Sequence, residues 1–204
     1  GLLSDGWSGA QWIKATQINK NSKINPEDKK QAKARMLLEM DVTLTSGNAS
    51  VLFGARDASN VFMWSVNTLD NEKEPLIRRH IYEGGRLQSS DTPIGKFFSK
   101  SDLLNKEHHL AIEAKEGVIK TSIDGVLVDT YTDTDSKLSN GYIGFRAFRG
   151  NNTNETAMFD NIVLTEYELK DGKEEAKVVL KEDFEKPQSL FEGCLLYTSP
   201  SPRD

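Results

Sequence analysis

The chain of 204 residues carries a formal net charge of -5, with acidic and basic residues interspersed. This balance argues against a nucleic-acid-binding protein, which needs a basic stripe to neutralise phosphates. No apolar run approaches the ~20 residues that cross a bilayer, and the one cysteine, Cys194, lies near the C-terminus, so the sequence predicts neither a membrane span nor a disulfide framework.

Strict alternation of apolar residues marks the first strand of a folded domain. Residues 1–34 are expected to form a lead-in with an edge strand, including a short helix at 25–33. One face of the segment that follows is apolar: Met36, Leu38, Met40, Val42 and Leu44. Because a period of two is typical of a half-buried strand, we expect the domain to begin near residue 35.

Further short segments of strand character follow, up to residue 167. They cover residues 51–55, 61–67, 76–83, 108–114, 118–123, 126–131, 141–148 and 157–167. Turn signals separate them, and Asp124-Gly125 is the strongest because a type I′ hairpin turn needs positive φ at both central residues. One short helix is expected at Ser99–Leu104. The pattern predicts an all-β fold, an antiparallel β-sandwich over residues 35–167.

The C-terminal part differs in character. Residues 168–193 are expected to form a linker, charged over Lys170–Glu175, and then the start of a truncated following domain, entered by a strand at 178–185. Residues 194–204 match the translation of a transposase-type sequencing adapter in one reading frame, so we exclude them as an artefact. The chain is therefore expected to be a piece of a longer protein, of the kind that environmental sequencing yields.

Several phrases of the domain resemble a known family. Val51–Asp57, Asn60–Trp64, Gly141–Arg146 and Phe159–Ile162 resemble the concanavalin A-like, laminin-G-like domains attached to bacterial glycoside hydrolases. The resemblance implies a jelly-roll sandwich that binds carbohydrate. It does not identify the ligand, because this fold hosts lectins, carbohydrate-binding modules, glucanases and adhesion domains.

A shorter resemblance suggests the parent protein. Trp7–Ile13 resembles the lead-in near the start of bacterial α-L-rhamnosidases. It implies a larger secreted enzyme, extracellular or periplasmic, that degrades a polysaccharide such as a plant cell-wall glycan. The domain would then be covalently continuous with a catalytic domain that this chain lacks.

Catalysis within the chain itself is not expected. Glucanases of this fold carry two or three carboxylates on one strand, spaced so that an acid and a nucleophile lie ~5 Å apart. Glu39 and Asp41 begin such a pattern, but Thr43 and Leu44 stand where the third carboxylate belongs. The adjacent pair His108-His109 should point to opposite faces of a strand and so cannot share a metal. No catalytic residue and no cofactor is therefore assigned.

A ligand-binding face is easier to derive from alternation. Arg78, His80 and Tyr82 share one face of their strand, and Arg146 points outward from its own. If both strands belong to one sheet, its outer face offers guanidinium groups, an imidazole and aromatic rings, which suit sugar hydroxyls and C–H faces. A uronic acid is a plausible guest because Arg binds carboxylates bidentately. The alternative is that Arg78 and Arg79 are ordinary solvated charges and Tyr82 only covers the face.

Two more candidates have two interpretations each. Alternation places Trp64 in the core, whereas the family resemblance keeps it near the ligand as a stacking platform. Asp57, with Asn60, either shapes a tight connection through hydrogen bonds to the backbone or contacts a ligand or a structural calcium ion. Asp160-Asn161 has the same two interpretations.

Three classes of function follow. The leading one is a non-catalytic carbohydrate-binding or accessory module of a glycan-degrading enzyme, which holds the catalytic domain near its polymer. The others are a laminin-G-type protein-interaction or adhesion domain and a structural spacer.

Overall fold

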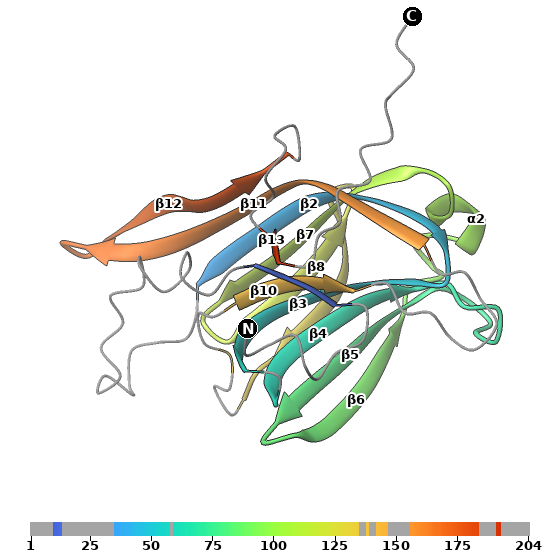
Figure 1. Cartoon of the computed structure of the whole chain (residues 1–204), viewed down its shortest axis with the longest axis horizontal. Helices are drawn as coiled ribbons and strands as arrows, with labels where there is room; N and C mark the ends of the chain where they lie inside the picture. Colours follow the sequence, from blue (N-terminus) through green and yellow to red (C-terminus); the bar gives the residue numbers. More distant parts are fainter. Residues whose placement is uncertain are drawn as a thin grey trace, which may run out of the picture.

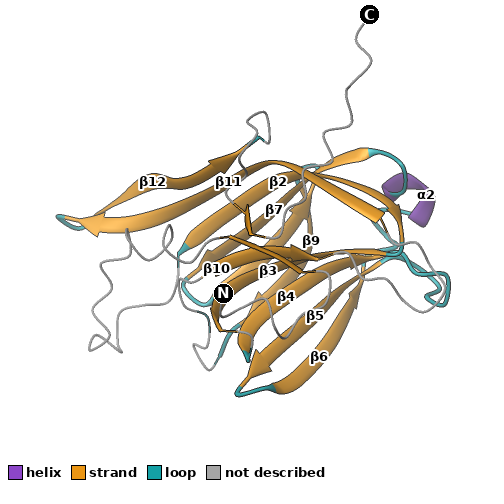
Figure 2. Ribbon diagram, viewed as in Figure 1, coloured by secondary structure: helices purple, strands orange, loops and turns teal. Residues whose placement is uncertain are grey.

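The described residues form a β-sandwich. The computed structural model describes residues 10–13, 35–57, 59–134, 138, 142–146, 156–183 and 191–192. They form two antiparallel sheets that pack face to face (Figures 1 and 2), which confirms the predicted all-β sandwich. Three sequence predictions lie outside these residues: the lead-in at Trp7, the helix at 25–33 and the artefact at 194–204.

Sheet A has seven described strands. In spatial order they are β13 (Phe191–Glu192), β1 (Ala10–Ile13), β10 (Tyr142–Arg146), β3 (Asn48–Asp57), β4 (Asn60–Asn67), β5 (Leu76–Glu83) and β6 (Arg86–Pro93). The four strands β3 to β6 follow one another in sequence and in space. Two-residue turns set the register of β3 with β4 and of β5 with β6, whereas residues 68–75 connect β4 to β5.

Sheet B has six described strands. In spatial order they are β12 (Lys173–Glu182), β11 (Thr156–Lys170), β2 (Met36–Ser46), β7 (Glu107–Lys115), β8 (Val118–Ile123) and β9 (Val126–Thr132). A single helical turn, α2 (Lys100–Leu103), precedes β7 within the segment where the sequence predicted a short helix, and the structure shows that Ser99 caps it. In the described part of the chain, no helix has the length and apolar character that crossing a membrane requires.

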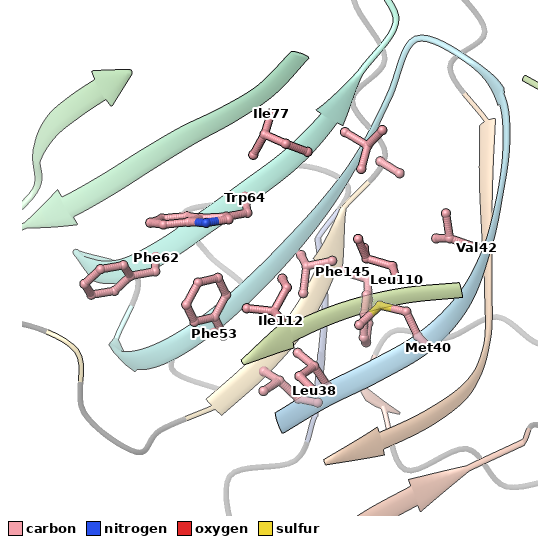
Figure 3. Packing of buried hydrophobic residues seen from close by; sticks show 14 of the residues in the cluster. Leu38, Met40, Val42, Phe53, Phe62, Trp64, Ile77, Leu110, Ile112 and Phe145 are labelled. Atoms are coloured by element: carbon pink, nitrogen blue, oxygen red, sulfur yellow. The ribbon is translucent and has the colours of Figure 1, made fainter. Parts of the chain in front are cut away.

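The core lies between the sheets. Along β2, buried residues alternate with partly exposed ones, as predicted from the sequence. Figure 3 shows Leu38 and Met40 of this strand, together with Phe53 and Trp64 of sheet A, among the packed side chains. Each fully buried side chain of this size contributes about 1.5–3 kcal/mol relative to an exposed one, so this apolar layer is the main source of stability.

Within the predicted domain, residues 35–167, one described strand was not predicted. Residues Arg86–Pro93 form β6 although nearly all of its side chains are exposed, so no apolar alternation indicates it. Its position follows from the turn Gly84-Gly85, whose residues both have positive φ, and from its pairing along the whole of β5. This edge strand is therefore specified by its turn and its neighbour and not by burial.

The segment Lys170–Glu175, expected as a charged linker or loop, is instead the tip of a hairpin. Asp171 and Gly172 have φ values of 49° and 75°, which a two-residue type I′ turn requires. On either side of the turn, Lys170 pairs with Lys173, and β12 continues alongside β11 to Glu182. These residues therefore belong to sheet B.

Candidate ligand-binding face

The strands that carry the predicted site belong to one sheet. β5 and β10 both lie in sheet A, with β3 and β4 between them. The pairing places one row of residues across the outer face: Arg146 opposite Ser50, Ser50 opposite Ser65, Ser65 opposite Arg78, and Arg78 opposite Asp91. The Ser50 and Ser65 hydroxyl oxygens are 2.7 Å apart at the centre of the row. The strands of Arg78 and Arg146 therefore belong to one sheet, and both residues lie on its outer face.

Two carboxylates hold Arg78. Its Nε and Nη2 donate to the two oxygens of Asp91, each over 2.9 Å, and Nη2 also donates to Glu72 over 2.8 Å. Hydrogen bonding to Asp91 raises the pKa of Arg78 above its ordinary value, and the same bond lowers the pKa of Asp91. The guanidinium is therefore fixed in orientation, and the two neighbouring carboxylates compensate its charge.

His80 and Tyr82 continue the face along β5. Their rings lie edge to face, with centroids 6.5 Å apart. Burial, followed by the positive charge of Arg78 and more weakly that of Arg146, lowers the pKa of His80. At neutral pH the imidazole is therefore uncharged. Its Nδ1 is shielded from solvent and has no hydrogen-bond partner among the residues that the structure describes. Such an atom marks a place where a polar partner would be stabilising.

The outer face is not equally open across the sheet. Leu52 of β3 and Met63 and Ser65 of β4 point away from the sandwich core, yet they are buried. By contrast, Arg78 is a quarter exposed and Asp91 more than a third. The accessible polar part of this face therefore lies over β5 and β6, and we define the β5–β6 site as Glu72, Arg78, His80, Tyr82 and Asp91.

Trp64 and Asp57, the candidates with two interpretations each, both have structural roles. Trp64 is only 2% exposed and packs in the core, with its ring centroid 5.1 Å from that of Phe53, so it does not join the outer face. Asp57 shapes the turn between β3 and β4 by accepting hydrogen bonds from the Ser59 amide over 2.8 Å and from the Asn60 side chain over 2.9 Å. Its carboxylate is occupied within the loop.

Sequence reasoning missed two members of the site. Asp91 lies on β6, the strand that apolar periodicity could not reveal, and Glu72 lies in a charged loop before β5. A signal for Asp91 was present, because a Gly-Gly turn places the residues after it opposite those before it. Counting outward from Gly84-Gly85 brings Asp91 opposite Arg78.

The outer face of sheet B carries the carboxylates considered for catalysis. Asp41 and Glu39 lie 3.1 Å and 3.3 Å from the two ring nitrogens of His109, and Asn161 donates to Asp41 over 2.8 Å. His108 points instead into the sandwich, so the two histidines face opposite ways as predicted. Among the described residues, no three His, Cys, Asp or Glu side chains are arranged to hold a metal ion.

Asp160-Asn161 forms a local structure. Asn161 has a φ of 49° beside a register shift of β11, and its amide donates to Asp160 over 2.7 Å. The pair therefore shapes an irregularity in the strand, and the Asn161 side chain connects it to β2.

No protein-family model and no curated protein matches the chain. Among solved structures, the carbohydrate-binding module CBM66 from Bacillus subtilis is 23% identical, over 66% of this chain and 77% of that one, with a TM-score of 0.48. A tetrameric galectin from the ball sponge Cinachyrella sp. is 11% identical, over 65% of this chain and 92% of that one, with a TM-score of 0.50. The homodimeric agglutinin CG-16 from chicken liver is 9% identical, over 65% and 96%, with a TM-score of 0.49. At these identities the likeness concerns the fold alone, an antiparallel β-sandwich.

Proposed function

We propose that this chain is a non-catalytic carbohydrate-binding module whose ligand lies on the β5–β6 site. The observation that carries the proposal is the fixed Arg78 guanidinium, clamped by Asp91 and Glu72, beside an uncharged His80 and the Tyr82 ring. Sugar hydroxyls take hydrogen bonds from such planar donors and acceptors, while the C–H face of a sugar ring packs on an aromatic ring. The groups are held in place before the ligand arrives, which lowers the entropy cost of binding.

The charges favour a neutral sugar over a uronic acid. Arg78 and Arg146 contribute two positive charges to this face, and Asp91 and Glu72 contribute two negative ones. A ligand carboxylate would have to compete with Asp91 for the same bidentate fork of Arg78. A neutral ligand can instead accept from the guanidinium edge and donate to the carboxylates without displacing either.

The parent protein is part of the same proposal. The resemblances in the sequence support a larger secreted glycan-degrading enzyme, an α-L-rhamnosidase among the candidates, acting outside the cell or in the periplasm on plant cell-wall glycans. A module tethered to a catalytic domain raises the concentration of that domain at the polymer. This role needs binding alone and no reactive group on the module.

The test is a glycan array and affinity-gel screen with arabinogalactan and fructan polymers as neutral ligands and pectic polymers as acidic ones. Wild type is compared with Arg78→Ala, His80→Ala and Arg146→Ala. The control is Lys120→Ala, which removes an exposed cation from the outer face of sheet B. Circular dichroism melts accompany each variant to verify folding.

We expect wild type and Lys120→Ala to bind a neutral polymer equally. A lost hydrogen bond to a charged group costs about 1.5–3 kcal/mol, so Arg78→Ala should bind about tenfold or more weakly. His80→Ala separates binding from folding if Arg78→Ala unfolds. Absence of binding across the panel would reject the proposal and favour an adhesion domain or a spacer, and preferred binding of pectic polymers would reject the neutral ligand.

A further inference from the structure

Over Lys173–Val178, the edge strand β12 is exposed, and among the described residues the outer backbone groups of this stretch pair with no further strand. In the described part of the chain, β11 is its one strand neighbour. All side chains from Lys173 to Val178 are exposed, and Val178 is 58% exposed. β11 pairs with β2 up to Glu166, and the Tyr167 amide donates to the Arg35 carbonyl over 3.4 Å. Beyond Tyr167 the hairpin is a two-stranded ribbon, which reaches past the sandwich in Figure 1. A two-stranded ribbon is marginally stable in water unless another strand joins it.

The register determines which backbone groups of β12 are free. In a two-residue hairpin the pair next to the turn, here Lys170 and Lys173, exchanges both hydrogen bonds, and the bonded pairs then recur at every second residue. The bonded positions of β12 are therefore Lys173, Glu175 and Lys177. The amide and carbonyl groups of the alternate residues point away from β11: Glu174, Ala176 and Val178.

This free edge is complementary to itself. Two copies of β12 can pair antiparallel about a two-fold axis perpendicular to the sheet that passes between the two Ala176 residues. Ala176 then bonds to Ala176, and Glu174 to Val178, through the backbone groups that are free. Between these pairs, Glu175 of each copy lies directly opposite Lys177 of the other, at the non-bonded positions where side chains come closest. The dimer thus contains two symmetric ion pairs.

Within a single copy, Lys177 lies opposite Glu166 and Glu174 pairs with Arg35, but Glu175 has an unfavourable neighbour. Glu175 pairs in register with Glu168 of β11, which places two like charges directly opposite one another. Among the described residues its one cation partner is Lys170, 3.0 Å away, and both side chains are more than half exposed. A Lys177 side chain on the open side of Glu175 would offset the repulsion from Glu168.

We infer that a second copy of this chain pairs with β12 about Ala176, so that the two copies of sheet B join into one continuous sheet. A second copy is the partner that the charge pattern favours, because the same register places every Glu175 beside a Lys177. The interface is isologous, as in most two-fold dimers. It lies on sheet B, away from the β5–β6 site, and it does not depend on the proposed function.

The test measures oligomeric state by sedimentation equilibrium across a range of chain concentrations. Reducing agent is present because Cys194 could otherwise form an intermolecular disulfide. Wild type should show a concentration-dependent dimer. Ala176→Pro removes an amide that points away from β11, so it should leave the hairpin intact and abolish the dimer. The matched control is Ala176→Ser, which keeps the amide and should dimerise like wild type.

Charge exchange tests the register. Glu175→Lys alone and Lys177→Glu alone each replace two attractive pairs with two repulsive ones, which should weaken dimerisation roughly tenfold or more. An equimolar mixture of these two variants restores opposite charges at both positions, so the mixture should dimerise as heterodimers. The double variant E175K/K177E should dimerise on its own.

Three results would overturn the inference. They are a wild-type chain that sediments as a monomer at every concentration, a dimer that Ala176→Pro leaves unchanged, and single charge variants that fail to recover on mixing. The last result alone would reject the Ala176 register, and the second would place the interface elsewhere on the molecule.

Discussion

Arg79 and Asp129 join the two sheets through a largely buried ion pair, with 2.8 Å between Arg79 Nη1 and Asp129 Oδ1. Arg79 projects from β5 into the sandwich, where its guanidinium lies 5.2 Å from the centre of the Tyr131 ring. The Asp129 side chain is 1% exposed and also accepts a hydrogen bond from Thr92 over 2.7 Å. Arg79 is therefore not the ordinary solvated charge of the alternative interpretation that the sequence left open.

Breaking this pair from one side should be costly. Asp129→Ala leaves the Arg79 charge buried without its counter-ion, which destabilises proteins by about 3–5 kcal/mol. The double variant R79M/D129L replaces both charges with apolar side chains and should be more stable than Asp129→Ala. Urea unfolding at neutral pH measures both. A double variant less stable than the single one would show that the pair stabilises the fold beyond satisfying its own charges.

The contrast between Arg78 and Arg79 shows what the sequence could predict. Alternation correctly placed Arg78 and His80 on one face and the apolar core on the other, because burial imposes a period of two on every strand. It could not show that Arg79, on the apolar side, has a partner. Asp129 lies on the other sheet, and no local pattern relates residues that are brought together only by the packing of two sheets.

The same limit explains the rest of the candidate site. The outer-face residues on β5 and β10 could be assigned to one site only on the assumption that the two strands share a sheet, because the sequence does not show which strands are neighbours. The partners of Arg78 come from an edge strand without apolar residues and from a loop. The hairpin at Asp171-Gly172 could have been predicted, because it has the same turn signal as Asp124-Gly125, but the high density of charges around it is also typical of a linker.

Two methionines provide a matched test of the core. Met40 is fully buried between the sheets, whereas Met158 on β11 is 62% exposed. Met40→Ala removes buried apolar atoms and leaves a cavity, so it should lower the free energy of unfolding by about 2–5 kcal/mol. Met158→Ala should change it by no more than about 0.5 kcal/mol. Urea unfolding of both variants measures the difference, and equal effects would contradict the assigned position of the core.

His109 should make stability depend on pH. The hydrogen bond to Asp41, supported by Glu39, raises the pKa of His109 above its ordinary value of 6.5. A raised pKa in the folded state means that the stabilisation is fully present below about pH 6.5 and is lost as the pH rises through the folded-state pKa. Thermal melts between mildly acidic and mildly alkaline pH should therefore show wild type losing stability relative to His109→Gln as the pH increases.

His80 serves as the internal comparison because its pKa shifts in the opposite direction. Burial lowers it, so protonation below pH 6.5 opposes folding, and His80→Gln should gain stability relative to wild type as the pH falls. Both variants should thus diverge from wild type at the acidic end of the pH range but with opposite signs, since His109→Gln becomes less stable than wild type there and His80→Gln more stable. Parallel curves for both variants would show that the two environments do not differ as described.

The hairpin turn allows a test of backbone conformation separate from packing. Gly172 has a φ of 75°, and a Cβ added there would meet no atom within 4 Å. Gly172→Ala therefore clashes with nothing outside its own backbone, and its cost of about 1–2 kcal/mol comes from the left-handed conformation alone. Because the ribbon lies outside the sandwich, amide hydrogen exchange should accelerate in Lys173–Ala176 and remain unchanged in the core strand β2. Acceleration throughout sheet B would mean that the hairpin unfolds together with the sandwich.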